Sequence, residues 1–408
     1  MIQAADVIVI GAGAFGASTA FYLAKLGKQV VLIDKYEPVS QTSPRAAGLT
    51  GHLRGTDELT RLALRSIETI ERFEEETGEP LVYEQPGSLK IARRLEHAEQ
   101  LREEVARARR LGLEVDFVSP QEACRLNPFL RPEGIRAVTY ARRDVYLEPG
   151  QIPRGYVRAA VRLGATLLAN TGVTGIAIDG GAVQGVVTDR GEIQAPVVVD
   201  AAGAWTRQVA AGVGLRIPLV PTRHQLLISE PLPGVEPNQP ITRIIDANVY
   251  VRPCEGGLML GGYEREPVQY DIDALPPGFQ IKDLPLDLGV LRRLADLVAE
   301  QLPVLQTIFD PPRIKEHRGG LPTMTADGRP LVGPLPGVRG FYVASGCCVG
   351  GLTTSPGNGW ALADWIVRGE PSPDALPMAP ARFGPEFADE AHLRAACYQR
   401  YANQYARH

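Results

Sequence analysis

The sequence predicts a mixed α/β (α+β) protein in which a parallel-sheet domain is split along the chain and a second domain carries an antiparallel sheet. Two observations predict the first domain. An apolar run at residues 7–10 breaks into a glycine-rich turn before a helix, and residues 340–368 repeat the order of strand, glycine loop and helix. The third observation is the region 219–310, where short alternating strands are separated by proline-rich turns.

The first 34 residues form a βαβ unit of the kind that binds dinucleotides. Gly11 allows a tight turn after the strand, Gly13 lets the backbone approach a pyrophosphate, and Gly16 lets the helix pack close to the sheet. The phosphates would face a helix N-terminus, whose free N–H groups and dipole offset their charge. Asp34 ends the second strand, where it can accept hydrogen bonds from a ribose diol. FAD and NAD share this Rossmann-like unit, so it does not choose between them.

Two later segments return to the same sheet. The apolar strand 197–199 runs into Asp200-Ala201-Ala202-Gly203-Ala204-Trp205, an AxGxW pattern that favours FAD over NAD. Residues 346–359 form a predicted glycine-rich loop before a helix over 360–368, which would place another helix N-terminus against the ligand. The predicted FAD-binding domain therefore comprises residues 1–80, 145–218 and 311–370, the substrate domain residues 81–144 and 219–310, and a C-terminal helical tail residues 371–408.

Other helices are predicted over residues 57–77, 95–111 and 151–162. The helix over 95–111 is amphipathic, and its arginine- and glutamate-rich side is expected to face solvent. Ser119, followed by Pro120 and then Glu122, is typical of a capping box that starts a short helix.

Composition limits the class of protein. With 408 residues and 44% hydrophobic content the chain can bury a large core, and about two domains are expected. A net charge of −4 gives no reason to expect nucleic acid or an anionic membrane as a partner. No apolar run approaches the length of a membrane span, and the chain enters a strand almost at once, so a cytoplasmic protein without a signal peptide is expected. The five cysteines contain no CxxC pair and the six histidines have no metal-ligand spacing, so neither a disulfide framework nor a metal site is indicated.

Six motifs place the chain near a known group: VIVIGAGAFG (7–16), TSPRAAGLTGHLR (42–54), VVDAAGAW (198–205), PTRHQ (221–225), TADGRPLVG (325–333) and GGLTTSPGNGWALADWI (350–366). Together they resemble the FAD-dependent D-amino acid oxidase superfamily, and within it the dimethylglycine and sarcosine dehydrogenase branch. The resemblance implies a flavin between the two domains, with its N5 accepting a hydride from a carbon next to a substrate nitrogen. The expected FAD contacts are Gly11, Gly13, Ala14, Phe15, Gly16, Asp34, Lys35, Thr42, Ser43, Arg45, Ala46, Ala47, Gly48, Leu49, Val173, Ala202, Gly203, Trp205, Gly346, Gly350, Gly351, Leu352 and Thr353.

Three departures from the family pattern refine this expectation. Relatives that bind FAD covalently place a histidine where this chain has Arg45, so FAD is expected to be noncovalent, with Arg45 either near a phosphate or in a surface salt bridge. Sarcosine oxidases use a lysine in the reaction of reduced flavin with oxygen, and Met259 and Thr353 stand at the matching positions, which favours a dehydrogenase. Pro322 stands where glycine- and D-amino-acid-oxidising relatives hold the substrate carboxylate with an arginine, which favours an N-methyl amino acid.

His224 and Tyr250 are the candidate catalytic residues. His224 belongs to a His-Gln pair that matches dimethylglycine-oxidising relatives, and an imidazole can hold or deprotonate an amine near neutral pH. Tyr250 is a candidate for closing the site over the substrate. The alternative interpretations are a satisfied core histidine and a packing tyrosine. The candidate substrate-binding residues are His52, placed near the flavin ring by the resemblance, and Arg252 and Arg318, which could reach a carboxylate or form structural ion pairs.

The sequence favours an FAD-dependent dehydrogenase of a small-molecule amine, an N-methylated or cyclic secondary amino acid of the sarcosine, dimethylglycine or proline type. An oxidase that produces hydrogen peroxide and a noncatalytic flavin-carrying subunit of a larger complex remain the alternatives. Residues 382–408 resemble the connector that leads into a folate-binding domain in dimethylglycine and sarcosine dehydrogenases. The resemblance therefore suggests a separate folate-binding subunit or free release of the one-carbon product, with a protein or a quinone as the electron acceptor.

Overall fold

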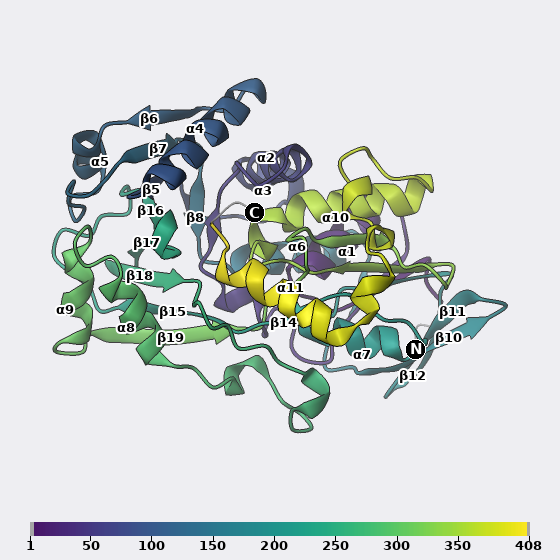
Figure 1. The fold of residues 1–408 in the computed structure, drawn as a ribbon. Coiled ribbons are helices and arrows are strands. Elements are labelled where there is room, and N and C mark those ends of the chain that lie inside the picture. The colour runs from purple at the N-terminus through teal and green to yellow at the C-terminus, as the bar shows by residue number, and fades with distance from the viewer. Residues whose placement is uncertain (1–3, 406–408) are drawn as a thin grey trace.

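A computed structural model describes residues 4–405 and confirms the predicted α/β class. Within this range the chain forms two large sheets, of six and eight strands, with helices packed around them (Figure 1). No helix among the described residues is both long enough and apolar enough to cross a membrane.

The first large sheet has six strands in the order β21-β22-β13-β1-β2-β9. Every neighbouring pair is parallel except β21 and β22. Strands β1 and β2 are apolar and fully buried, as expected for parallel strands covered on both faces. The strands are β1 (Val7–Ile10), β2 (Val30–Ile33), β9 (Thr166–Leu168), β13 (Val197–Asp200), β21 (Leu331–Pro334) and β22 (Phe341–Ser345).

Helices cover this sheet, and α1 is packed between α6 and α10. The α1 side of that contact contains Phe21 and Tyr22, whose rings lie 5.1 and 5.9 Å from the ring of Tyr156 on α6. The helices of this part are α1 (Ala14–Lys25), α2 (Asp57–Glu71), α3 (Phe73–Thr77), α6 (Gln151–Arg162), α7 (Thr206–Ala211) and α10 (Gly351–Arg368). The predicted helix over 57–77 is therefore interrupted at Arg72, between α2 and α3.

Helix α10 begins nine residues earlier than predicted, at Gly351 instead of residue 360, and includes Pro356. A proline inside a helix leaves the carbonyl four residues earlier without its usual donor. Here the Ser355 hydroxyl donates to that Leu352 carbonyl at 3.2 Å. A glycine-rich segment is a poor helix by propensity, but a Cβ at Gly359 would lie 2.3 Å from the Ser18 hydroxyl of α1. The glycines therefore permit α10 to pack close to α1, and the sequence pattern alone does not predict this tertiary contact.

The second large sheet has eight strands in the order β19-β15-β18-β17-β16-β5-β7-β6. The prediction of an antiparallel sheet is correct for every pair except β16 and β5, which are parallel. These two strands come from different chain segments, and a parallel pair needs a long connection, not a hairpin. The strands are β5 (Ser88–Ala92), β6 (Val115–Val118), β7 (Ala137–Ala141), β15 (His224–Ser229), β16 (Ile241–Ile244), β17 (Val249–Cys254), β18 (Gly257–Gly262) and β19 (Ile314–Gly320).

Smaller elements complete the described chain. The helices are α4 (Leu95–Arg110), α5 (Pro120–Leu126), α8 (Leu288–Asp296), α9 (Gln306–Phe309) and α11 (Glu390–Ala402). The small sheets contain β3 (Leu49–Thr50), β4 (Tyr83–Glu84) and β8 (Val145–Leu147), then β10 (Val173–Asp179), β11 (Ala182–Thr188) and β12 (Gly191–Gln194), and finally β14 (Val220–Pro221) and β20 (Thr323–Met324). The yellow helix α11 crosses the front of the molecule (Figure 1).

Candidate active site

Two cavities meet at the glycine turn after β1. One, of about 430 Å³, is lined by the carboxyl ends of β1 and β2 and by residues 201–205. The other, of about 210 Å³, lies between the two large sheets and reaches the N-terminus of α10. Both cavities are lined by Gly13, Thr42, Ser43, Ala201, Gly203 and Ala204. We call them the nucleotide cavity and the flavin cavity, after the two halves of the FAD that the sequence predicts here.

Nearly all of the predicted cofactor contacts line these cavities. The nucleotide cavity has Gly11, Gly13, Asp34, Lys35, Thr42, Ser43, Val173, Ala202, Gly203 and Trp205. The flavin cavity has Gly13, Ala14, Phe15, Thr42, Ser43, Arg45, Ala46, Ala47, Gly48, Leu49, Gly203, Gly350, Gly351, Leu352 and Thr353. Gly16 and Gly346 line neither cavity. Gly16 instead packs against the turn, since a Cβ there would lie 1.8 Å from the Gly11 carbonyl oxygen.

The glycine turn fits a dinucleotide. Gly11 has a φ of +100°, and a Cβ on it would lie 2.4 Å from the Ala201 carbonyl oxygen, so a side chain is excluded. At Gly13 an added Cβ would meet only the Ser43 hydroxyl, at 3.2 Å. The missing Cβ at Gly13 therefore leaves room for a pyrophosphate close to the backbone.

Asp34 lies at the carboxyl end of β2 and lines the nucleotide cavity. Its Oδ2 accepts from the Ala12 N–H at 2.7 Å and its Oδ1 from the Tyr36 N–H at 2.9 Å. Burial raises the pKa of Asp34 to about 6, although these hydrogen bonds oppose the change. A carboxylate oxygen can accept more than one hydrogen bond, so a ribose hydroxyl can still be recognised here.

Residues 45–49 run along the flavin cavity, and two arginines fix their backbone. Arg252 Nε donates to the Ala47 carbonyl at 2.8 Å, and Arg318 donates to the Ala46 carbonyl at 3.1 Å. Neither arginine lines the flavin cavity, so both lie behind the segment that does. Arg45 does line it, and its buried Nε has no hydrogen-bond partner among the described residues. An anionic group or a ring carbonyl oxygen of a bound ligand could accept a hydrogen bond from this N–H.

His224 is held between two tyrosine hydroxyls at the end of the flavin cavity. Its Nδ1 lies 2.7 Å from the Tyr401 hydroxyl of α11, and its Nε2 lies 2.9 Å from the Tyr250 hydroxyl of β17. Burial lowers the pKa of His224 to about 4, so the ring is neutral at pH 7. Burial likewise raises the pKa of Tyr250. One imidazole nitrogen donates and the other accepts, so the three side chains form one polar chain in an apolar wall.

Arg54, Arg243 and Tyr405 line the same cavity beside this chain. Arg243 and Tyr263 lie close enough to Tyr405 to offset part of the rise that burial causes in its pKa, and the Tyr263 and His224 ring centroids lie 5.1 Å apart. The Arg54 guanidinium makes no hydrogen bond or ion pair with the described residues, and it packs over Gly350, where a Cβ would lie 2.7 Å from its nitrogen. A guanidinium without a partner among the described residues thus lines the same cavity as His224.

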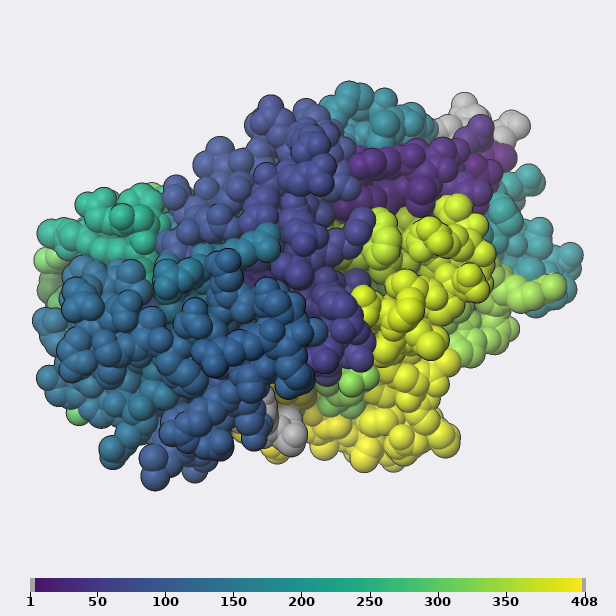
Figure 2. All heavy atoms as spheres, turned by 90° about the horizontal axis from the view of Figure 1, so that it is seen from above, coloured from purple at the N-terminus to yellow at the C-terminus, as the bar shows by residue number. Residues whose placement is uncertain are grey.

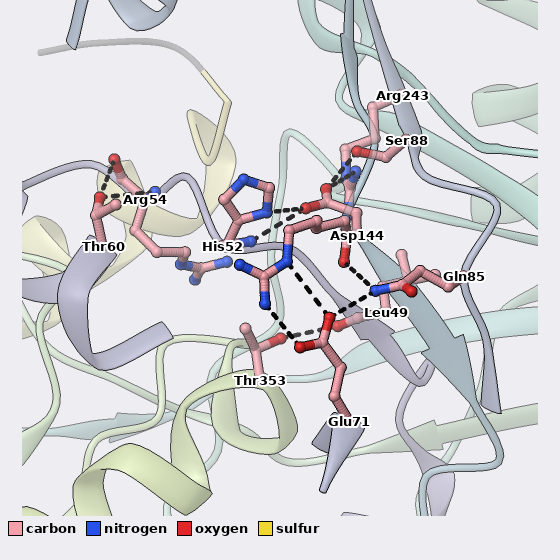
Figure 3. Close-up of polar contacts among 11 residues, drawn as sticks. Leu49, His52, Arg54, Thr60, Glu71, Gln85, Ser88, Asp144, Arg243 and Thr353 are labelled. Carbon is pink, nitrogen blue, oxygen red and sulfur yellow. Dashed lines mark hydrogen bonds and ion pairs between the residues drawn. The ribbon is translucent and has the colours of Figure 1, made fainter. Parts of the chain in front are cut away.

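His52 lies behind the flavin cavity and does not line it. Its Nδ1 is 2.6 Å from Oδ1 of buried Asp144, which also accepts from the Ser88 hydroxyl and faces Arg243 (Figure 3). Burial alone would raise the pKa of Asp144, but His52, Arg243 and Ser88 outweigh it and hold the pKa at about 2. The carboxylate therefore links the His52 loop to the Arg243 side chain.

Sequence reasoning missed Arg54, Arg243, Tyr263, Tyr401 and Tyr405. One signal was available, because Tyr401 and Tyr405 both belong to the C-terminal tail that the sequence predicts as helical, although helix α11 itself ends at Ala402. The Arg54 position also ends the quoted motif 42–54. The long-range pairing of His224 with Tyr401, 177 residues apart, had no local signal.

Comparison with known families agrees with this geometry. A sequence profile described as "FAD dependent oxidoreductase" matches residues 6–365. The chain belongs to this family. The cavities therefore form the site of an FAD-dependent oxidoreductase, and FAD is its cofactor.

Individual proteins are also similar. The chain is 32% identical over 410 residues to mitochondrial sarcosine dehydrogenase of Mus musculus, covering 98% of this chain and 44% of that protein. It is 31% identical over 389 residues to mitochondrial dimethylglycine dehydrogenase of Rattus norvegicus, covering 93% of this chain and 45% of the relative. The chain thus spans less than half the length of these relatives. The solved structure of L-proline dehydrogenase from P. horikoshii has a TM-score of 0.83 at 24% identity, covering 94% of this chain and 98% of that one, and it shows the shared fold.

Proposed function

We propose that this FAD-dependent oxidoreductase oxidises the C–N bond of an N-methylated or other secondary amino acid and passes the electrons to an acceptor other than oxygen. One observation carries the proposal: the flavin cavity is lined both by the neutral His224–Tyr250 pair and by the free guanidinium of Arg54. The bound FAD supplies the two-electron acceptor that converts the amine to an imine, which water then hydrolyses.

Arg54 supports a carboxylate-bearing substrate. A partly buried guanidinium without a partner carries a desolvation cost that a carboxylate relieves through two parallel hydrogen bonds. Arg243 also lines the cavity and faces the buried Asp144 carboxylate at 3.7 Å. We infer that Arg54 binds the substrate carboxylate and that Arg243 and Tyr405 position it.

His224 and Tyr250 support an amine at the other end of the substrate. An imidazole that stays neutral does not repel a cationic ammonium, and the Tyr250 hydroxyl bonded to it can accept a hydrogen bond from the substrate ammonium N–H. Proton loss from the substrate ammonium must precede hydride removal, because the nitrogen lone pair drives the formation of the imine. The Tyr250–His224–Tyr401 chain offers that proton a path of hydrogen bonds.

The apolar part of the flavin cavity lining supports an N-alkylated substrate. Pro322 lines the flavin cavity where glycine- and D-amino-acid-oxidising proteins of the resembled superfamily have their carboxylate arginine. A carboxylate held on the Arg54 side leaves the N-alkyl group facing the apolar wall. Sarcosine and dimethylglycine, the substrates in the names of two relatives, have this form.

The lining of the flavin cavity supports a dehydrogenase. No lysine is among the described residues that line it. Lys90 lines an adjoining cavity and is paired with Glu104 at 2.7 Å. Without a lysine beside the flavin, the reaction of reduced flavin with oxygen is expected to be slow.

Two side chains support noncovalent FAD. Arg45 occupies the cavity wall at the position where covalent relatives have histidine, and arginine does not form such a bond. Cys347 also lines the cavity, but burial raises the pKa of its thiol, which makes it a poor nucleophile.

Anaerobic mixing of the holoprotein with sarcosine, dimethylglycine, proline and glycine tests the proposal. Loss of the oxidised flavin absorbance with an N-methyl or cyclic secondary amino acid, faster than with glycine, is expected. The rate at which the oxidised flavin absorbance recovers in air then separates the two classes of enzyme. Recovery should be slow for a dehydrogenase and fast for an oxidase. The Arg54→Gln variant should raise KM for the amino acid by about tenfold or more, whereas an N-methyl amine without a carboxylate should be oxidised equally by both proteins. If no amine of the panel reduces the flavin, the proposed activity is wrong.

Acid precipitation tests the mode of FAD attachment. The yellow colour should remain in the supernatant, and colour in the protein pellet would show a covalent bond.

A further inference from the structure

A third cavity, of about 910 Å³, adjoins the flavin cavity. The two share the wall formed by Gly51, Arg54, Arg243, Gln404 and Tyr405. Helix α4 and the segment after residue 53 form one side of the third cavity, and α11 with residues 326–329 forms the other. Figure 2 shows the face on which the blue α4 region, the dark segment before it and the yellow C-terminal part meet. We call this space the basic cavity for the reason that follows.

Four acidic side chains line the basic cavity, Glu103 among them, and the other three have cationic partners. Glu104 is paired with Lys90 at 2.7 Å, and Asp144 lies 3.7 Å from Arg243 in addition to its bond with His52. Asp327 is paired with Arg382 at 2.8 Å. These carboxylates therefore leave little negative charge for the remaining arginines.

Four arginines that line the cavity have no carboxylate within 4.0 Å among residues 4–405: Arg54, Arg110, Arg329 and Arg400. Arg400 Nε is buried without any hydrogen-bond partner among those residues, and so is Oε1 of the neighbouring Gln404. Arg107 also lines the cavity and turns its guanidinium to the backbone carbonyls of residues 54 and 55. These arginines gather around one cavity in a protein whose net charge is −4.

The arginines also face one another. Burial has the largest effect on the pKa of Arg54 and lowers it, whereas Tyr263 raises it. The charges of Arg243 and Arg400 also lower this pKa, so the three guanidinium groups lie within electrostatic reach of one another. Like charges held together without counterions are unfavourable unless an anion enters between them. The cavity volume falls in the range of sites that hold a whole small molecule.

We propose that the basic cavity binds a multiply charged anion, bearing phosphate or carboxylate groups, as a ligand separate from the amine substrate. Arg110, Arg329 and Arg400 hold its charged groups from opposite walls, and Gln404 Oε1 accepts a hydrogen bond from it. The ligand reaches Arg54 and Arg243 across the shared wall. If the proposed amino acid oxidation is correct, the bound anion therefore competes for Arg54 and raises KM for the substrate carboxylate.

Titration calorimetry of the holoprotein at low salt tests the site directly. Pyrophosphate and citrate are the two probes, because they distinguish phosphate from carboxylate recognition at similar size. The Arg110→Gln/Arg400→Gln double variant should bind the preferred probe at least about tenfold more weakly. The control is Arg102→Gln/Arg109→Gln, which removes the same charge from the same region. Both control arginines are paired, lie on α4 and are absent from the cavity lining.

Saturable binding that the cavity variant loses and the control variant keeps supports the proposal. Binding of pyrophosphate alone assigns a phosphate ligand, and binding of citrate alone assigns a polycarboxylate. Absence of binding for both probes at millimolar concentration, or equal weakening in both double variants, overturns the proposal. Flavin reduction by a saturating amino acid should be unchanged in the cavity variant. Failure of the wild-type protein to oxidise any amine would refute the proposed function and leave the binding result intact.

Discussion

His224 should make the stability of the folded protein sensitive to acid. Its pKa is about 4 in the folded state, against 6.5 for an ordinary histidine, because burial disfavours the charged ring. The folded state therefore binds this proton less readily than the unfolded chain. The stability is fully present above pH 6.5 and is lost as the pH falls toward 4.

The size of the effect follows from the shift. One pKa unit corresponds to about 1.4 kcal/mol, so the complete loss is about 3 kcal/mol, and about 2 kcal/mol of it falls between about pH 7.5 and pH 5. The His224→Gln variant cannot gain this proton, and its amide can still bond to Tyr250 and Tyr401. We therefore expect the wild-type protein to lose about 2 kcal/mol more than the variant over that range.

Denaturant unfolding at fixed FAD concentration, repeated at several pH values, measures this difference. The exposed His392 of α11 provides the matched control, because His392→Gln also removes an imidazole. An equal loss of unfolding free energy in wild type and His224→Gln would refute the assignment of a buried neutral ring.

Three further variants test the site. Gly16→Ala should lose FAD, since its Cβ would lie 1.8 Å from the Gly11 carbonyl oxygen, and an unchanged ratio of flavin to protein absorbance would contradict this. Tyr401→Phe removes the partner of His224 Nδ1 and should slow anaerobic flavin reduction about tenfold while FAD content stays the same, so an equal rate would exclude a positioning role. Asp144→Asn leaves Arg243 facing a neutral group and should destabilise the fold by about 3 kcal/mol at pH 7. The difference from wild type should shrink only as the pH falls toward 2, where Asp144 itself takes up a proton, and acid unfolding curves measure it.

The parts of the fold that follow from local pattern were predictable. The strand, turn and helix at residues 7–25 agree with the sequence expectation because each glycine there has a single steric purpose. The early start of α10 was not predictable, because burial against α1 outweighs the weak helix propensity of its glycines. The parallel pair of β5 and β16 was equally hidden, since it joins two distant segments.

The residues of the candidate site likewise divide into those that the local sequence predicts and those that it does not. Contacts made by backbone in short motifs, such as Gly350 and Gly351, lie where the sequence suggested. Side chains whose roles depend on contacts between distant segments cannot be predicted from the spacing of residues in the sequence. Arg252 and Arg318 hold backbone carbonyls behind the cavity, whereas Arg54, which lines it, is recognised only by its lack of a partner.

The position of α11 has a consequence for protein synthesis. One of the two hydrogen bonds of His224 is made with Tyr401, so this part of the active site is completed only after residue 401 has left the ribosome. Domains generally fold as units during synthesis, from the N-terminus onward. The β1 turn and the N-terminus of α10 must also meet before FAD has both ends of its binding site. We therefore expect flavin to bind only after α10 has been synthesised, and α11 to cover His224 later still.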